Sequence, residues 1–170
     1  ERRVRQFREY EFERVGETLK PDALALACAS KDSARFSAAL LRVAALWERA
    51  LAVRSDNVAI LRLAAEKMRG RKILLASATP QTAAELTNVA AETGAALALA
   101  ADNFDDLTAM VKTATSQKFR EIFLELRADS PSEHLQNNIL IRRAARKGGV
   151  KTLGFPTVRF TDTGRAADDV

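Results

Sequence analysis

Short apolar runs alternate along the chain with longer stretches whose apolar residues recur at helical spacing. Runs of Ala, Leu, Val and Ile indicate strands, and each is followed by a polar turn and a stretch typical of an amphipathic helix. The repeat is roughly 25 residues long, which is the length that a strand-turn-helix-turn unit requires. The pattern predicts strands at 23–29, 50–53, 72–76, 95–100 and 121–126, helices around 36–47 and at 57–68, 81–92, 104–114 and 132–147, and a sixth candidate strand at 152–160.

Residues at the predicted helix ends support this division. Thr79 and Ser130 each precede a proline, so each is expected to cap a helix whose first residue is that proline. Glu133 follows Ser130 at the spacing of a capping box. Gly94 stands where a helix should stop, since glycine readily adopts the left-handed conformation that ends helices.

The strands are continuously apolar, which indicates a parallel sheet with both faces covered and helices around it. Two α/β architectures satisfy this pattern. One is a TIM-barrel-like repeat, incomplete here with about six βα units, and the other is a doubly wound open sheet, which the length favours. Residues 30–35, after the first strand, contain no glycine, so a dinucleotide-binding turn is not predicted. We expect residues 1–22 to form a charged lead-in and residues 23–170 a barrel-type domain that is truncated.

Composition narrows the class of protein further. A hydrophobic share of 47% with 29% charged residues is that of a globular domain, and no apolar stretch reaches the ~18 residues of a membrane span. We therefore expect a cytoplasmic protein with no membrane partner. The net charge is +5, but basic and acidic residues are interleaved and aromatic residues are few, so no nucleic-acid partner is predicted. Cys28 is the only cysteine, so the chain cannot supply the thiolates of an iron-sulfur cluster.

Two stretches carry a family resemblance. They are residues 11–40, EFERVGETLKPDALALACASKDSARFSAAL, and residues 138–147, NILIRRAARK, with the following TLGFPTV at 152–158. In this order and spacing they resemble the barrel domain of the large (gamma) subunit of the corrinoid iron-sulfur protein of the CO dehydrogenase and acetyl-CoA synthase system. Two loops depart from that family, because Lys31 replaces an expected glycine and residues 125–130 replace an Asp-Pro-Gly turn.

The resemblance implies a function for the parent protein. It implies a barrel domain that acts mainly as scaffold and docking surface in methyl transfer from methyltetrahydrofolate to acetyl-CoA synthase, in the Wood-Ljungdahl pathway. It also implies cobalamin and a [4Fe-4S] cluster in the parent protein, with neither bound within this segment. The implied partners are the small corrinoid protein subunit, methyltetrahydrofolate methyltransferase and acetyl-CoA synthase.

Two other functions stay open beside the methyl-carrier subunit. One is a free-standing barrel enzyme related to pterin-dependent methyltransferases, for which Asp102-Asn103 and Asn137-Asn138 offer an Asp and Asn set. The other is an open-sheet domain that binds a small ligand or has a regulatory role. Because no self-sufficient catalytic constellation is found, whether the chain is an enzyme stays undecided, and a carrier or scaffold role is favoured.

Polar side chains at the carboxyl ends of the strands are the candidate binding residues, since this end carries function in α/β barrels. Hydroxyls, amides and arginines there can hydrogen-bond a corrin or a partner protein. The alternative is that Asp56, Thr79 and Asp102 cap the helices that follow. His134 and Cys28 are expected to be a surface or packed histidine and a small core residue, and no catalytic or metal-binding residue is predicted. The candidates are Ser30, Arg54, Ser77, Thr79, Asp102, Asn103, Arg127 and Thr157.

Overall fold

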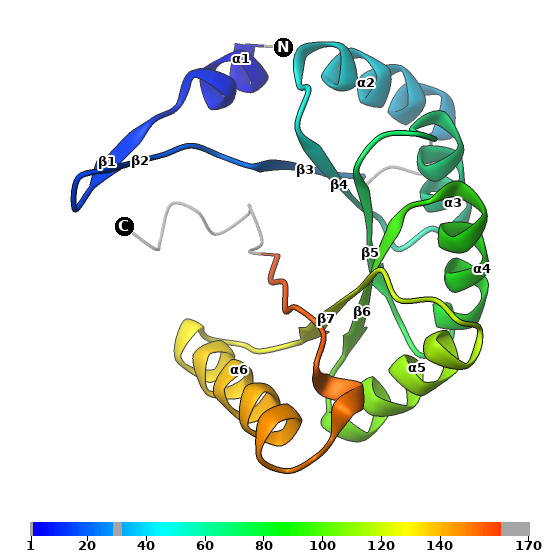
Figure 1. The fold of residues 1–170 in the computed structure, drawn as a ribbon. Helices are drawn as coiled ribbons and strands as arrows, with labels where there is room; N and C mark the ends of the chain where they lie inside the picture. The colour runs from blue at the N-terminus through cyan, green and yellow to red at the C-terminus, as the bar shows by residue number, and fades with distance from the viewer. Residues whose placement is uncertain (1, 29–31, 161–170) are drawn as a thin grey trace.

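A computed structural model of the chain describes residues 2–28 and 32–160. Its centre is a five-stranded parallel sheet in the order β3-β4-β5-β6-β7, so that each strand pairs with the next one in the chain (Figure 1). The strands are β3 (Ala23–Ala27), β4 (Ala50–Arg54), β5 (Ile73–Ala78), β6 (Ala96–Ala101) and β7 (Ile122–Leu126). The helices that follow them are α2 (Ser33–Leu46), α3 (Val58–Lys67), α4 (Ala83–Thr93), α5 (Phe104–Ser116) and α6 (Pro131–Arg146).

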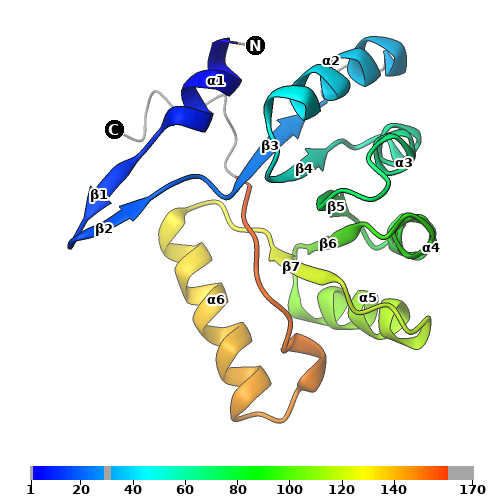
Figure 2. The same ribbon diagram turned by 45° about the horizontal axis from the view of Figure 1, so that its top comes forward.

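Helices α2 to α5 form an outer arc along one face of the sheet (Figure 1, Figure 2). Each of these helices contacts the next one along the arc. Right-handed crossovers that always move to the neighbouring strand place every connecting helix on the same face. A doubly wound sheet instead reverses its strand order and carries helices on both faces. The predicted parallel βα repeat is confirmed, and its strand order is that of an incomplete barrel.

The two faces of the sheet carry side chains of different size. Successive residues of a strand point to opposite faces, and the ALALA pattern of β3 and β6 therefore places leucines on one face and alanines on the other. The leucines pack into the main core with the helices; Leu97 and Leu99 are fully buried there. The opposite face, which we name the inner face, is lined largely by alanines such as Ala52, Ala98 and Ala100. The strands are largely apolar even though, over residues 2–28 and 32–160, the helices of the arc pack against one face of the sheet.

The sixth predicted strand, at 152–160, does not form. Lys151–Leu153 is a short 3-10 helix, η1, and Thr157 makes only an isolated parallel bridge to Leu124. Leu124 N–H donates to the Pro156 carbonyl at 2.8 Å, and Val158 N–H donates to the Leu124 carbonyl at 2.9 Å. Pro156 has no N–H to extend this pairing. The segment nevertheless lies beside β7, which is the place of the next strand in barrel order.

The N-terminal lead-in contains more structure than its charge predicted. It forms α1 (Arg2–Glu9) and an antiparallel hairpin of β1 (Phe12–Arg14) and β2 (Glu17–Leu19). Val15 and Gly16 connect these strands with φ angles of 54° and 79°, the pair of positive angles that a tight two-residue hairpin turn requires. Helix α1 is anchored through Phe7, whose ring centroid lies 5.7 Å from that of Trp47.

The structure confirms the predicted cap at Ser130 but not the one at Thr79. Ser130 caps α6 as predicted, because its Oγ accepts the Glu133 N–H at 3.1 Å, while the Glu133 carboxylate accepts the Asp129 N–H at 2.8 Å. The prediction for Thr79 was wrong, because α4 begins at Ala83 with Thr82 as its N-cap. The Thr79 carbonyl instead accepts the backbone N–H groups of both residues in a turn.

Two adjacent leucines of α2 lie in different environments. Leu41 is 47% exposed, whereas Leu40 is fully buried. Consecutive helical residues are rotated by about 100°, so only one of these two leucines can face the sheet. The predicted stop of α4 is confirmed, since Gly94 ends the helix with φ 75°.

Candidate functional site

Most of the predicted binding residues that the structure describes lie at the carboxyl ends of the strands, but the structure brings only some of them together. Arg127, after β7, forms an ion pair with Asp102, after β6, at 3.4 Å between Nη1 and Oδ1. Both side chains are largely exposed, and such pairs add little to stability. Thr157 is exposed beside β7, and Ser30 lies outside the described residues.

Several of the candidates serve as local caps and turns. Asn103 is the N-cap of α5, and its amide makes two 2.8 Å hydrogen bonds to Asp106, one to the backbone N–H and one to the carboxylate. The helix caps considered at Asp56 and Asp102 are therefore the next residues in the chain, Asn57 and Asn103. Asn57 caps α3 by accepting the Ala59 N–H at 2.9 Å.

The hydroxyl of Thr79 lies 3.3 Å from that of Thr82, within the turn before α4. The Asp and Asn set considered for a pterin is likewise engaged elsewhere. Asn137 donates weakly to the Arg127 carbonyl at 3.5 Å, and Asn103 is occupied by its cap. These residues therefore have local structural partners.

A buried polar pair lies on the inner face of the sheet. Glu125 of β7 is only 6% exposed, and its carboxylate accepts a hydrogen bond from the Ser77 hydroxyl of β5. Neighbouring strands are about 4.8 Å apart, so the backbones of β5 and β7 are separated by about 10 Å with β6 between them. Ala98 and Ala100 of β6 are small enough to let the two side chains meet across that strand.

The first turns of α6 bring more polar groups to the same region. The Asn138 Nδ2 atom lies 3.1 Å from His134 Nε2, and Arg159 donates to the Ser130 carbonyl at 3.0 Å. Partial burial lowers the pKa of His134, the charge of Arg159 lowers it further, and the charge of Glu125 opposes the shift. We refer to Ser77, Glu125, His134, Asn138 and Arg159 as the inner-face cluster.

Arg54 adds a contact at the end of β4. Its guanidinium carbon lies 5.7 Å from the centroid of the Phe160 ring, within the range of a cation–π interaction. Together with the backbone pairs of Leu124 and the Arg159 hydrogen bond, this contact holds residues 156–160 against the carboxyl end of the sheet. The polar residues here therefore fix a returning chain segment.

Most of the inner-face cluster was missed by sequence reasoning. Ser77 was predicted, Asn138 was considered only as part of the Asp and Asn set for a pterin, and His134 was expected to be a surface or packed histidine. Glu125 and Arg159 were not proposed as site residues. One available signal was Glu125 itself, a carboxylate in the otherwise apolar strand sequence IFLEL. Its alternation with Leu124 and Leu126 places it on the inner face.

The residues of this chain do not fit an iron-sulfur cluster, because such a cluster requires four thiolates and Cys28 is the only cysteine. Over residues 2–28 and 32–160, no group of three His, Cys, Asp or Glu side chains could hold a metal ion. In the same part of the chain, no helix has the length and apolar character to cross a bilayer.

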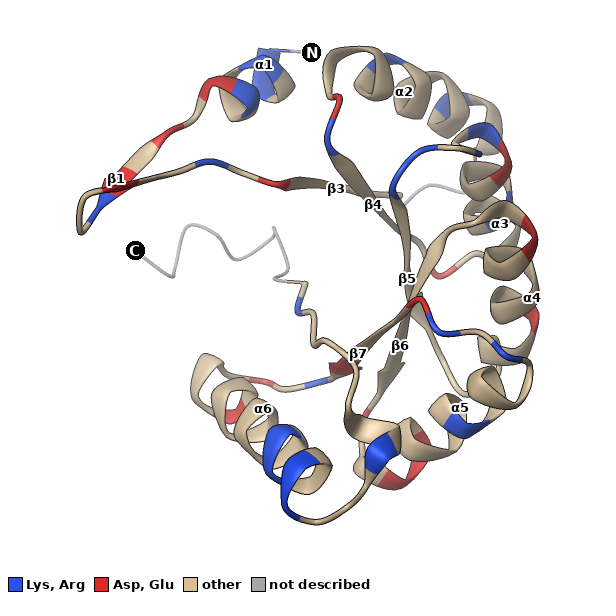
Figure 3. Cartoon of the chain, in the orientation of Figure 1, with Lys and Arg blue, Asp and Glu red and all other residues tan. Residues whose placement is uncertain are grey.

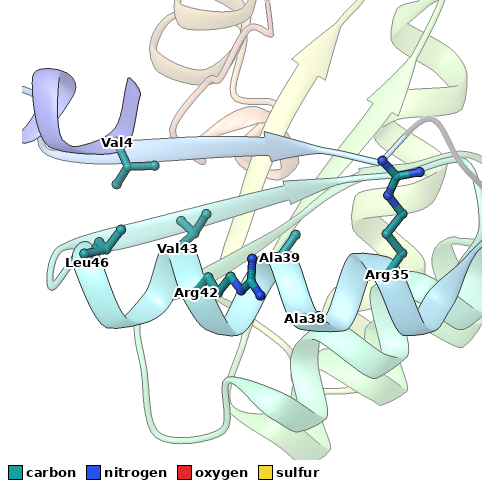
Figure 4. Close-up of a pocket in the computed structure, with 7 residues that line it drawn as sticks. All are labelled: Val4, Arg35, Ala38, Ala39, Arg42, Val43 and Leu46. Carbon is teal, nitrogen blue, oxygen red and sulfur yellow. The ribbon is translucent and has the colours of Figure 1, made fainter. Parts of the chain in front are cut away.

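Two surface hollows lie away from the predicted site. One, of about 440 Å³, lies along α2 beside α1 and is lined by residues that include Val4, Arg35 and Arg42 (Figure 4). The other, of about 370 Å³, lies between Ala90 and Gly94 at the end of α4 and residues 117–121. Neither hollow includes a candidate from the sequence.

The fold and the inner-face cluster define a parallel βα-repeat domain of barrel-like order. All of its residues, 1–170, match the family described as the CO dehydrogenase/acetyl-CoA synthase delta subunit, and the chain belongs to this family. The resemblance read from the sequence is thereby confirmed.

The chain is also similar to named proteins of the same enzyme system. The chain is 28% identical over 159 residues to the corrinoid/iron-sulfur protein large subunit of Moorella thermoacetica, covering 94% of this chain and 36% of that protein. It is 28% identical over 162 residues to the acetyl-CoA decarbonylase/synthase complex subunit gamma of Methanocaldococcus jannaschii, covering 93% of this chain and 33% of that protein. The chain thus spans about a third of the length of these relatives.

Proposed function

We propose that this chain is the barrel-like scaffold and docking part of a corrinoid iron-sulfur protein large subunit, which acts in methyl transfer from methyltetrahydrofolate to acetyl-CoA synthase. The observation that carries this proposal is the family match over the whole chain, together with relatives whose names include both corrinoid and iron-sulfur protein. The proposed partners are the small corrinoid protein subunit, methyltetrahydrofolate methyltransferase and acetyl-CoA synthase.

In this proposal the cofactors are held outside this chain. A single cysteine does not meet the requirement of a [4Fe-4S] cluster. The polar groups that could face a corrin have partners within the protein, since Glu125 accepts from Ser77 and His134 lies within hydrogen-bond distance of Asn138. The chemistry of methyl transfer would be supplied by the cobalt of a corrin bound elsewhere in the assembly.

The contribution of this chain is then a rigid surface. The inner-face cluster and the contact between Arg54 and Phe160 fix residues 156–160 at the carboxyl end of the sheet. A docking surface needs such fixed geometry, because ordering a mobile segment on binding costs affinity. The exposed pair of Asp102 and Arg127 at the same end offers charges to a partner.

A spectroscopic titration tests whether the corrin is bound outside this chain. Addition of cobalamin to the chain should give the sum of the two separate ultraviolet-visible spectra, and a stoichiometric base-off complex would contradict the scaffold role. The large subunit of Moorella thermoacetica serves as the corrinoid-binding control.

A binding experiment tests the docking role. The chain should co-migrate with the purified small corrinoid protein subunit in size-exclusion chromatography. Separate migration of the two proteins at concentrations up to about 100 μM would reject docking to that subunit. The binding free energy would then be weaker than roughly 5 kcal/mol. Calorimetry with methyltetrahydrofolate is the check on the enzyme alternative, and we expect no heat of binding.

A further inference from the structure

A basic groove runs along the outer side of α2. Its walls are formed by one face of that helix and by Val4 of α1, and its volume is about 440 Å³. Figure 4 shows Val4 opposite the Leu46 end of α2, Arg35 at the other end, and Arg42 between them. We name this surface the α1–α2 groove; its lining residues are Val4, Arg35, Ala38, Ala39, Arg42, Val43 and Leu46.

The groove has the shape of a helix-binding surface. Its α2 residues follow the i, i+3, i+4, i+7, i+8 and i+11 pattern from Arg35 to Leu46, which is one continuous stripe along a helix. At 1.5 Å per residue the stripe is about 16 Å long, or three helical turns. Ala38 and Ala39 form its middle, where small side chains allow another helix to approach closely. An elongated stripe of this kind suits a helix better than a compact ligand.

The arginines around this groove outnumber the acidic residues of the two helices. Four lie on α1 and two on α2, all exposed, and the acidic residues are Glu9 on α1 and Asp32, the N-cap of α2, whose carboxylate accepts the Arg35 backbone N–H. Six arginines against Glu9 and Asp32 give +4, which is most of the formal net charge of +5 of the whole chain. Figure 3 shows the resulting blue segments of both helices. The six arginines are Arg2, Arg3, Arg5, Arg8, Arg35 and Arg42.

Other arginines of the protein are engaged within the fold. Arg62 pairs with Glu85 at 2.9 Å, and Arg71 donates to the carbonyls of Ala44 and Trp47. Within residues 2–28 and 32–160, by contrast, no side chain of the six arginines on α1 and α2 makes a hydrogen bond or an ion pair. These guanidinium groups are therefore available to carboxylates of another molecule.

We propose that the α1–α2 groove binds a helix of a partner protein that carries an apolar centre flanked by carboxylates about seven residues apart. The carboxylates would meet Arg35 and Arg42, whose planar guanidinium groups suit bidentate pairing, and the apolar centre would cover Val43, Leu46 and the alanines. This inference rests on the proposed docking role and names the chemistry of the partner. The apolar floor favours a protein helix over a nucleic acid, which would leave that floor uncovered.

A designed peptide tests the groove directly. The probe is an amphipathic peptide of about 18 residues, long enough to hold helical structure, with Ala and Leu on one face and Glu at positions seven apart. Its matched control has Lys in place of each Glu. Calorimetry should show that the Glu peptide binds and that the Lys peptide binds at least about tenfold more weakly, and binding should weaken as salt rises.

Matched variants separate the groove from general charge attraction. R35E/R42E should weaken binding of the Glu peptide about tenfold or more, because two favourable contacts become repulsive. K112E/R142E changes the net charge equally on exposed positions of α5 and α6 and should alter the affinity less than about twofold. R35Q/R42Q removes the charges without reversing them and should give an intermediate loss. Circular dichroism checks that each variant is folded.

Several results would overturn the inference. These are equal binding of both peptides, an equal loss in K112E/R142E, a duplex DNA or an anionic vesicle that binds through Arg35 and Arg42 when the Glu peptide does not, and self-association that R35E/R42E abolishes. The last result would assign the groove to a second copy of the chain. The proposed function is tested separately, because the cobalamin titration does not depend on this groove.

Discussion

The hydrogen bond between Ser77 and Glu125 should be one of the more costly polar contacts to remove. A bond to a charged group contributes about 1.5–3 kcal/mol, and a buried carboxylate that loses its donor also suffers desolvation. Because Glu125 is only 6% exposed, water can replace the lost donor only in part. Ser77→Ala should therefore lower the free energy of unfolding by about 2 kcal/mol.

A double-mutant cycle isolates this contact. Glu125→Leu alone leaves the Ser77 hydroxyl without its acceptor, whereas Ser77→Ala combined with Glu125→Leu removes both polar groups from the inner face. The double variant should be closer to the parent protein than the sum of the single effects, by about 1–2 kcal/mol.

Urea unfolding, followed through the fluorescence of Trp47, the only tryptophan, gives the four free energies. A coupling energy below about 0.5 kcal/mol would refute the conclusion that the two side chains meet across β6. Ala100→Leu provides an independent check, because a larger side chain on β6 should separate the pair and destabilise the fold by about 1–3 kcal/mol.

Four further predictions concern the helices and the inner-face cluster. Leu40→Ala should destabilise the fold by about 2–5 kcal/mol in urea, whereas Leu41→Ala, its half-exposed neighbour, should change stability by less than about 0.5 kcal/mol; equal effects would contradict the assigned faces of α2. Ser130→Ala should cost about 1 kcal/mol through loss of the α6 cap, and an unchanged urea midpoint would contradict that role. The pKa of His134 is lowered from about 6.5, so the unfolded state binds more protons just below that pH and the free energy of unfolding should fall as the pH drops through 6.5. Arg159→Gln should raise the pKa of His134 in an NMR titration, and a lower value would contradict the charge effect.

The strands and most helices could be predicted because their signals are local. In β3 and β6 the alternation of Ala and Leu sets both the strand and the face that packs on the helices. Ser130 could be identified as a cap because its hydroxyl needs only a backbone N–H three residues away. Thr79 has the same sequence signal but lies in a turn, since the hydroxyl of Thr82 accepts its N–H at 3.0 Å and the helix starts later.

The inner-face cluster depends on contacts that the sequence does not contain locally. Ser77 and Glu125 lie 48 residues apart and meet only because the strand between them carries alanines on that face. Arg159 reaches Ser130 across 29 residues, and this contact depends on the path of a segment that was predicted to be a strand. Predicting such contacts requires the strand order and the register of the sheet.

The strand order of the sheet has a consequence for how the chain folds. Every strand from β3 to β7 has as its partner the strand made immediately before or after it, so no pairing waits for a distant segment. Folding is faster when contacting residues are close in sequence, since less chain entropy is lost before each contact forms. The sheet can therefore grow one strand at a time as the polypeptide leaves the ribosome, from the N-terminal strand onward.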